Sequence, residues 1–457
     1  MEYNDPVQKK RGICVENEIF QETNVAKAYM KLSVPLVCSM VVTLIYNLAD
    51  TFFVAQTNDT NIVAGVSLGM PVFTLLMAMG NIFGQGGSSL VSRLLGQQEE
   101  EGVRCVSSFC FYITILVGIV IGAFMLLFRL PLLAMIGASP ETFSHASDYF
   151  VYLAIGAPII MLSFIHSNLL RSEGMSKESM AGTILGAVVN IILDPIFISV
   201  WGWGAGGAAI ATVIGYLTSD LFFAVVVLRK SRVLSVAIGK SKVSHGVVFQ
   251  ILKIGVPAAI VNLMQSASVV LMNQFLLPYG NQKIAAMGIV LKISMIALLL
   301  LTGFAFGGQP LFGYYYGAGD KARLSALFRF CVRFIGLVAI LLTAGIYAAA
   351  PLLMRCFMDS EGIVADGTVM LRWQVLTMLF VGLILLMTIL FQAMGKATGA
   401  FILSISRQGV LFLLVLMVAY HLAGYDGVVV SQAISDCLTA IIAFGLFQTQ
   451  LRKEFRA

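Results

Sequence analysis

An uncharged apolar stretch at residues 105–128 decides the fold class of this chain. It reads CVSSFCFYITILVGIVIGAFMLLF, 24 consecutive residues without Asp, Glu, Lys or Arg. A helix needs about 20 predominantly apolar residues to cross the hydrocarbon core of a bilayer. Apolar stretches of this length recur between residues 31 and 451. The sequence therefore predicts an all-α polytopic membrane protein.

The overall composition supports the same fold class. Of 457 residues, 59% are hydrophobic and 11% are charged, against roughly 45–50% and about 25% in a soluble domain. A soluble chain of this length would hold about three domains, and so few charges cannot cover three surfaces. These proportions exclude a soluble enzyme, a nucleic-acid-binding protein, a β-barrel and a disordered protein.

Twelve spans are expected from the apolar stretches. They cover residues 31–54, 61–91, 105–128, 146–170, 178–200, 205–228, 247–277, 284–316, 324–350, 365–394, 398–421 and 425–449. If the N-terminus is cytoplasmic, 24 of the 29 Lys and Arg residues fall on the cytoplasmic side, counting Arg407 just inside its span. Short cytoplasmic loops carry such an excess. Both termini are therefore predicted to be cytoplasmic, and the net charge of +6 reflects topology rather than a polyanion site.

The N-terminal tail and the cysteines add two expectations. The first 25 residues are polar and lack the apolar core of a signal peptide, so the first span would serve as the uncleaved signal. Of the seven cysteines only Cys356 falls in a predicted outer loop. A disulfide framework is therefore not expected, and the cysteines are interpreted as packing residues.

The chain contains an internal repeat. A shift of about 222 residues aligns Lys31-Leu-Ser-Val-Pro35 with Lys253-Ile-Gly-Val-Pro257. The same shift aligns three glycines of the first half with three of the second, namely Gly80, Gly84 and Gly96 with Gly303, Gly307 and Gly319. Corresponding points are separated by six spans, an even number, so both halves cross the membrane in the same direction. This is a parallel repeat, whose halves are related by an axis along the membrane normal.

The repeat predicts two six-helix lobes. Residues 27–228 form the expected N-lobe and residues 247–450 the expected C-lobe. A cytoplasmic loop at residues 229–246 joins them, and tails at residues 1–26 and 451–457 flank them. Duplicated lobes are typical of secondary transporters, in which one lobe rocks against the other around a central site.

The sequence also bears on the energy source. It contains no Gly-x-x-x-x-Gly-Lys-Ser/Thr phosphate loop. Unless a separate subunit hydrolyses ATP, an ion gradient would drive transport. A membrane enzyme is the less favoured class, because the four histidines form no ligand motif; they are His145, His166, His245 and His421. A scaffold would not explain the distribution of carboxylates described next.

Ionisable residues within the spans are candidates for function, because a charge in hydrocarbon is costly. The aspartates clearly within spans are Asp50, Asp194, Asp220 and Asp436. In the first span, offsets of 0, 3, 4 and 7 place one polar stripe along a helix face; its members are Thr43, Tyr46, Asn47 and Asp50.

The fifth and sixth spans carry two further polar faces. Asn190 and Asp194 are four residues apart, and Pro195 frees the carbonyl of Ile191. Carboxylate, amide and carbonyl oxygens together suit a small cation or a proton. In the sixth span Thr212, Tyr216 and Asp220 form a stripe, and Tyr149 begins the fourth span. Asp50, Asp194, Thr212 and Tyr149 fall at a similar predicted depth and are expected to converge.

The repeat places this polar site in the N-lobe alone. Met272 aligns with Asp50, and about Val415 aligns with Asp194. A carboxylate needed only for folding should often occur in both lobes, so ion coupling is predicted in the N-lobe. The alternative for each aspartate is an interhelical hydrogen bond that only holds the fold, and it is strongest for Asp220 and Asp436.

The second half offers an apolar binding surface. Methionine and phenylalanine side chains are adaptable and suit flat lipophilic molecules, although ordinary packing is the simpler interpretation for each. The candidates are Met264, Met272, Met287, Met295, Phe275, Phe304 and Phe306. Lys292 and Arg407 are cations within the second half. Lys292 could line the cleft, pair with a carboxylate or be structural.

These motifs resemble those of the multidrug and toxic compound extrusion (MATE) transporters. The similarity lies in Tyr46-Asn-Leu-Ala-Asp50-Thr-Phe-Phe-Val54, in Asn190-Ile-Ile-Leu-Asp194-Pro-Ile-Phe, in the segment Gly207 to Thr212, and in Gly308-Gln-Pro-Leu311 with Gly317-Ala318. It extends over about residues 27–450 and is closest to the bacterial multidrug-efflux branch with acidic residues in the N-terminal lobe.

The resemblance implies a monomeric antiporter of the bacterial cytoplasmic membrane, without a cofactor. Such a protein would expel cationic lipophilic drugs or dyes in exchange for protons or Na⁺. It implies a cation site at Asp50, Asn190 and Asp194, with Thr212 and Tyr149 beside it. The sodium-coupled branch has a glutamate in the seventh helix, where this chain has Gln265, and another acidic group near Val381, where it is apolar.

That departure weakens a C-lobe sodium site. It favours protons, or Na⁺ held in the N-lobe, and makes Gln265 a candidate contact for substrate. A flippase for a lipid-linked precursor is the remaining alternative from the same broad superfamily. It would need several cations in its cleft for a pyrophosphate, and only Lys292 and Arg407 are candidates.

Overall fold

The computed structural model describes residues 18–358 and 360–455. Within these residues all regular structure is helical, which confirms the predicted all-α fold class. The first 17 residues of the predicted N-terminal tail, including Cys14, lie outside the described part, as do Arg456 and Ala457.

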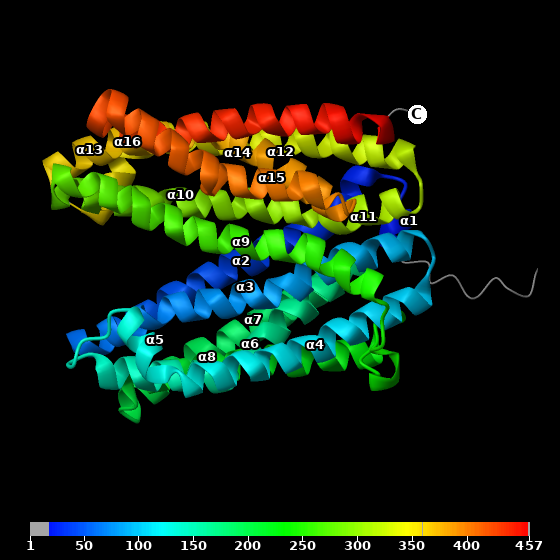
Figure 1. The fold of residues 1–457 in the computed structure, drawn as a ribbon, viewed down its shortest axis with the longest axis horizontal. Helices are drawn as coiled ribbons and strands as arrows, with labels where there is room; N and C mark the ends of the chain where they lie inside the picture. The colour runs from blue at the N-terminus through cyan, green and yellow to red at the C-terminus, as the bar shows by residue number, and fades with distance from the viewer. Residues whose placement is uncertain (1–17, 359, 456–457) are drawn as a thin grey trace, which may run out of the picture.

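The first half of the chain builds one lobe (Figure 1). Its helices are α1 (Glu18–Gln21), α2 (Val25–Ala55), α3 (Thr60–Gly96), α4 (Glu100–Leu127), α5 (Arg129–Met135), α6 (Phe143–Ser172), α7 (Ser176–Pro195) and α8 (Gly204–Arg229). Side chains cap the first turns of the long helices: Asn24 accepts hydrogen bonds from the amides of Ala26 and Lys27, and Asp59 accepts one from Asn61. Within this N-lobe, α6 lies at the centre and packs against α3, α4 and α8.

The second half builds the C-lobe. Its helices are α9 (His245–Leu276), α10 (Asn281–Gly307), α11 (Gln309–Gly317), α12 (Lys321–Phe357), α13 (Glu361–Leu376), α14 (Met378–Ala393), α15 (Ala397–Gln408) and α16 (Val410–Leu446). Figure 1 shows α9 to α16 on one side of the molecule and α2 to α8 on the other. Helix α1 is the exception, because Phe20 stacks on Tyr314 of the C-lobe with ring centroids 4.4 Å apart.

The number of candidate spans depends on how the bent helices are divided. Ten helices of the described chain are long and apolar enough to cross a membrane, or eleven if α13 and α14, which meet at 41°, form one bent span. The segment Ala397–Glu454 counts once although it has 58 residues. Gly424 breaks its helical geometry (φ 55°, ψ −124°), and the chain turns back there (Figure 1). The predicted count of twelve requires a division at this glycine.

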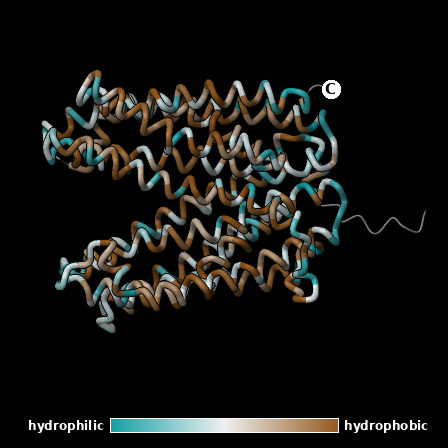
Figure 2. Tube along the Cα trace, in the orientation of Figure 1, coloured by the Kyte–Doolittle hydropathy of each residue, from teal (hydrophilic) through white to brown (hydrophobic). Residues whose placement is uncertain are grey.

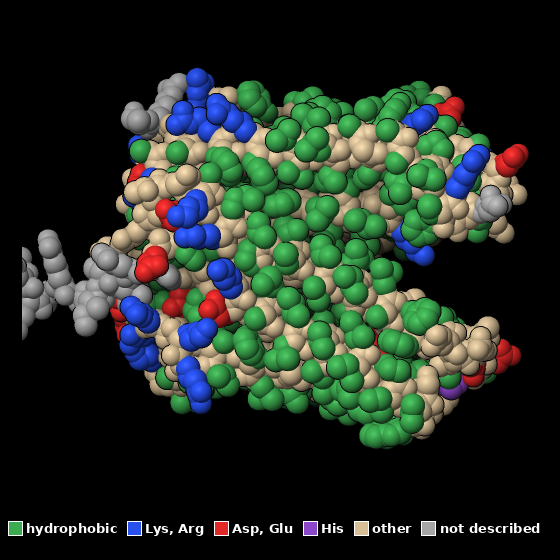
Figure 3. All heavy atoms as spheres, turned by 180° about the vertical axis from the view of Figure 1, so that it is seen from behind, with side chains coloured by type: hydrophobic (Ala, Val, Ile, Leu, Met, Phe, Trp, Pro, Cys, Tyr) green, Lys and Arg blue, Asp and Glu red, His purple; other side chains and the backbone are tan. Residues whose placement is uncertain are grey.

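Polar and apolar residues separate along the length of the molecule. Hydrophobic residues dominate the middle of the helices, and hydrophilic residues concentrate at the two ends (Figure 2). One end, here called the terminal end, holds α1 and the C-terminus (Figure 1). Lys and Arg side chains gather at the terminal end (Figure 3). The opposite end is called the open end, because a hollow separates the two lobes there (Figure 3).

Close glycine contacts join the lobes toward the terminal end. A Cβ on Gly86 of α3 would overlap the carbonyl of Ile251 in α9, and one on Gly255 of α9 would overlap the carbonyl of Ile82. Gly307 of α10 likewise has no room for a side chain beside Ser33 of α2. Ser89 of α3 donates a hydrogen bond across the interface to the carbonyl of Gln392. These contacts bring the backbones of the two lobes together at this depth.

Candidate functional site

A cavity of about 520 Å³ lies between the two lobes. Helices α2, α3, α6, α7 and α8 form one wall, and α9, α10, α14 and α15 form the other. Its lining combines apolar side chains with a few polar ones, such as Asn47, Thr212, Gln265 and Gln392. This size and chemistry suit a drug-sized molecule, since ligand pockets typically hold about 300–1,000 Å³.

Two carboxylates form a polar cluster beside this cavity. Asp194 lies in the last turn of α7 and is 0% exposed. Asn190, one turn earlier, donates a hydrogen bond of 3.3 Å from Nδ2 to its Oδ1. Asp50 of α2 lies close enough to Asp194 to interact with it electrostatically. The chain continues after Pro195 as a π-helix at Ile196–Val200, an irregularity often found at functional sites.

Hydroxyl groups complete the cluster. Tyr149 of α6 lies within electrostatic range of both Asp50 and Asp194. Tyr46 interacts with Thr212 through its hydroxyl and lies within electrostatic range of Asp50 and Tyr149. The Tyr149 ring lies against Gly69 of α3, where a Cβ would overlap it. The structure therefore brings six of the predicted residues together from four helices.

Oxygen atoms of this cluster are left without a donor. Asp50 Oδ1, Asn190 Oδ1 and Asp194 Oδ2 are all buried and have no hydrogen-bond partner among the described residues. Buried acceptors of this kind are costly unless something satisfies them. A proton on a carboxyl group, or a small cation between the oxygens, would do so. No group of three or more His, Cys, Asp and Glu residues in the described chain is placed to hold a metal ion, and this cluster has two carboxylates.

The remaining residues of the predicted stripes lie elsewhere. Asn47 is exposed and lines the cavity. Asp220 faces His166 of α6, with 3.4 Å between Oδ1 and Nδ1. Both side chains are almost completely buried. His166 was not expected as a partner, because the two residues are 54 positions apart and only helix packing joins them.

The predicted apolar surface is only partly in the cavity wall. Gln265, Met295 and Phe306 line the cavity. Five other candidates do not: Met272 and Met287 are buried in the core of the C-lobe, Met264 packs against Gly409, and Phe275 and Phe304 pack edge-to-face on Tyr420 and Phe334. A methionine serves equally well as core filling, and helical spacing alone does not distinguish the two roles.

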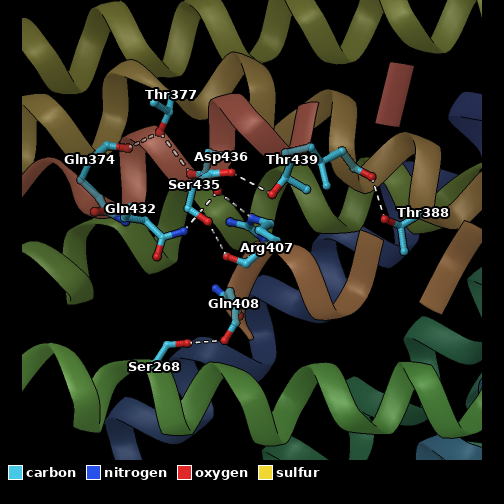
Figure 4. Close-up of polar contacts among 11 residues, drawn as sticks. Ser268, Gln374, Thr377, Thr388, Arg407, Gln408, Gln432, Ser435, Asp436 and Thr439 are labelled. Atoms are coloured by element: carbon cyan, nitrogen blue, oxygen red, sulfur yellow. Dashed lines mark hydrogen bonds and ion pairs between the residues drawn. The ribbon is translucent and has the colours of Figure 1, made fainter. Parts of the chain in front are cut away.

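Arginines line the cavity where few cations were expected. Arg407 is in the wall, together with Arg171 of α6, which sequence analysis missed. Lys292 is exposed and does not line the cavity. Arg407 also pairs with Asp436, at 3.3 Å from Nε to Oδ1, and Gln432 and Thr377 contact the same carboxylate (Figure 4). These two roles were expected for Lys292; in the structure Arg407 has both.

Comparison with known proteins identifies the family. The MatE family model matches residues 35–196 and 257–418. The chain belongs to the MATE transporter family. The two matched segments begin and end 222 residues apart, which confirms the internal repeat of this MATE transporter. It is a multi-pass membrane transporter and not an enzyme.

Named relatives and solved structures support the same family assignment. The chain is 31% identical over 424 residues to the multidrug export protein MepA of Staphylococcus aureus (strain NCTC 8325 / PS 47), covering 93% of this chain and 94% of that one. MepA of Staphylococcus saprophyticus is likewise 31% identical, over 425 residues. A MATE structure in the bent conformation superposes with a TM-score of 0.89 and 26% identity, covering 96% of this chain and 97% of that one. An outward-facing multidrug resistance MATE transporter gives the same TM-score and identity, covering 96% and 98%.

Proposed function

We propose that this MATE transporter exports cationic lipophilic drugs or dyes in exchange for protons. The observation that carries the proposal is the cluster of Asp50, Asn190 and Asp194, which has buried oxygens without donors and stands beside a drug-sized cavity. We place the protein in the bacterial cytoplasmic membrane as a monomer, with both termini cytoplasmic. The gathering of Lys and Arg at the terminal end supports this orientation (Figure 3).

In this orientation the hollow faces outward. The glycine contacts of Gly86 and Gly255 close the cavity toward the cytoplasm. Transport then requires the lobes to part at the terminal end and to meet at the open end. The central cavity keeps its walls on both lobes, so it serves as the site to which access alternates.

The carboxylate pair supplies the coupling. Two ionised carboxylates at close range repel each other, and burial adds to the cost of the second charge. A proton that enters from the outside relieves the repulsion between Asp50 and Asp194. Because Asp50 shares helix α2 with cavity residues Thr43 and Asn47, a change in its charge reaches the substrate wall. Proton release toward the cytoplasm resets the pair.

Sodium is the alternative coupling ion. The three oxygens without donors come from two carboxylates and an amide, and hard oxygen ligands also suit Na⁺. A site with only three protein oxygens would need further ligands from water. The same cluster would therefore serve either ion, and the gradients must be tested separately.

The first experiment compares dye efflux from proteoliposomes under an imposed pH gradient and under an imposed Na⁺ gradient. We expect the pH gradient alone to drive efflux by the wild type. Asp50→Asn should lower that rate by about tenfold or more, because the titrating group is lost. Asp366→Asn, whose carboxylate pairs with Lys283 away from the cavity, is the matched control and should behave as wild type.

The outcomes separate the hypotheses. If only the Na⁺ gradient drives efflux, the proposed coupling site stays the same and the coupling ion is Na⁺ instead of a proton. Normal pH-driven efflux by Asp50→Asn would remove Asp50 from the mechanism. If no dye moves under either gradient, the lipid-linked precursor becomes the better substrate, and Arg407 is the cavity cation that would contact its pyrophosphate.

A further inference from the structure

The charged residues of the cavity wall have one sign. Arg171 and Arg407 line it, and no Asp or Glu does among the described residues. Asp50 and Asp194 stand behind the wall rather than in it. A substrate that enters this cavity can therefore contact the guanidinium groups directly, whereas the carboxylates of Asp50 and Asp194 lie behind other side chains of the wall.

The two arginines differ in how far their donors are occupied. Arg171 donates hydrogen bonds to the Ser167 hydroxyl and to Asn168 Oδ1, both at 2.7 Å, and to the Ser179 hydroxyl at 3.5 Å. Its donors are directed into the N-lobe. Among the described residues, the Arg407 side chain makes one hydrogen bond, from Nε to Asp436 Oδ1. Its two terminal nitrogens are therefore available to a ligand, since they make no hydrogen bond within the described chain.

The Asp436 carboxylate binds the Arg407 guanidinium on the side away from the cavity. Asp436 is 1% exposed, whereas the Arg407 side chain is 14% exposed. Asp436 Oδ1 also accepts a hydrogen bond of 3.1 Å from Gln432, and Oδ2 accepts one of 3.2 Å from Thr377 (Figure 4). The negative member of the pair is thus enclosed, and the positive member faces the cavity.

The backbone around Arg407 is also held in place. The helix breaks at Gly409, between α15 and α16. Ser268 of α9 donates a hydrogen bond to the carbonyl of Gln408, and Ser435 donates one of 3.4 Å to the carbonyl of Arg407 (Figure 4). A discontinuous membrane helix beside a central cavity is a typical place for substrate contacts. Arg407 is therefore presented to the cavity in a preorganised position.

We propose that Arg407 is a subsite for the carboxylate of zwitterionic amphiphiles. Their aromatic, cationic body would occupy the apolar part of the cavity, and their carboxylate would accept two parallel hydrogen bonds from the free edge of the guanidinium. This inference rests on the proposed drug-efflux function and narrows its substrate class. It assigns the Arg407–Asp436 pair to recognition as well as to packing.

The test compares two dyes that differ only at the carboxyl group. Rhodamine 110 carries a free carboxylate, and rhodamine 123 is its methyl ester. Binding to purified protein in a non-ionic detergent is measured by fluorescence anisotropy. We expect the wild type to bind rhodamine 110 at least as tightly as rhodamine 123.

Variants then separate recognition from stability. The double variant R407Q/D436N removes both charges and leaves no buried carboxylate unpaired. It should weaken rhodamine 110 binding by about tenfold and rhodamine 123 binding by less than about twofold. Arg407→Lys keeps the positive charge but loses the planar fork, and should also reduce the preference for the carboxylate. Arg372→Gln, an arginine that stacks on Tyr347 outside the cavity, is the matched control and should change neither affinity.

Other results would overturn the proposal. If R407Q/D436N binds both dyes more weakly by the same factor, the Arg407–Asp436 pair has a structural role only. An unchanged rhodamine 110 affinity in that variant would exclude Arg407 as the subsite. Displacement of rhodamine 110 by phosphatidylglycerol, but not by zwitterionic drugs, would assign the arginine to a lipid headgroup. Gradient-driven efflux of rhodamine 123 tests the drug-efflux function separately, so either proposal can fail alone.

Discussion

Four aspartates within the spans have three different surroundings. Asp50 and Asp194 lie near each other with unpaired oxygens, Asp220 faces His166, and Asp436 accepts from Arg407, Gln432 and Thr377. The alternative of structural hydrogen bonding therefore fits Asp436 best. Asp436 has three donors and is positioned to hold the fold, whereas Asp50 Oδ1 and Asp194 Oδ2 accept no hydrogen bond from the described residues.

The Asp436 surroundings give a prediction for stability. Asp436→Asn leaves the Arg407 guanidinium without its counter-charge. Breaking a fully buried pair costs roughly 3–5 kcal/mol, and because Arg407 reaches the cavity we expect about 1–3 kcal/mol here. Thermal denaturation in detergent should show a lower Tm for Asp436→Asn and a recovered Tm for R407Q/D436N. A double variant less stable than the single one would contradict this account.

At the scale of helices, glycines determine where the lobes meet. Gly86 of α3 and Gly255 of α9 allow the two backbones to touch, and Gly317 of α11 does the same against the carbonyl of Arg93. Small residues are the usual means of close helix approach in lipid, where no hydrophobic driving force exists between helices. At the terminal end, the two lobes are therefore held together by backbone contacts as well as by side-chain hydrogen bonds.

Gly86→Ala tests this contact. The new Cβ would overlap the Ile251 carbonyl, so the lobes must separate slightly at the terminal end. Overpacking of this kind costs about 1–3 kcal/mol. We expect a lower Tm and slower efflux, measured in detergent and in proteoliposomes. Gly345→Ala, which has open space around its Cβ position, is the control, and equal effects of both changes would exclude the contact as the cause.

The connection between the lobes is anchored to the N-lobe at Glu173. Glu173 lies between α6 and α7, where it accepts hydrogen bonds of 2.6 Å from the Ser231 hydroxyl and 3.1 Å from the Arg232 amide. Burial raises the pKa of Glu173 above its ordinary value of 4.5, against the effect of these hydrogen bonds. The ionised carboxylate is thus disfavoured in the folded protein.

The sign of the pH dependence follows from that shift. Because the folded pKa is raised, the contribution of Glu173 to stability is fully present below pH 4.5 and is lost as the pH rises through the folded pKa. Glu173→Gln keeps an acceptor without the charge, so its Tm should exceed that of the wild type at neutral pH, and the difference should shrink toward pH 4.5. A difference that grows on acidification would contradict the assignment.

At the scale of the whole molecule, the two ends differ in how closely the lobes approach each other. The lobes touch near the terminal end and part at the open end (Figure 3). Alternating access by rigid-body rocking of the lobes around a central site would require these two separations to change in opposite directions.

Spin labels measure both separations. In a background without native cysteines, one pair at Asn58 and Asn281 reports on the open end, and another at Gln98 and Lys321 reports on the terminal end. When protonation or substrate changes the state, double electron–electron resonance should show the first distance shortening as the second lengthens. If both distances change in the same direction, the result contradicts a rocking motion of the two lobes.

The sequence by itself determined the all-α membrane fold, the parallel repeat and the polar residues Asp50, Asn190 and Asp194 that lie together in the N-lobe. These follow from apolar length, from self-similarity and from helical spacing, all of which are local properties of the chain. Helical spacing fixes which side chains share a face, but the neighbour of that face depends on how the helices pack. Only the tertiary structure therefore decided that Asp220 faces His166, that Met272 and Met287 belong to the core, and that arginines line the cavity.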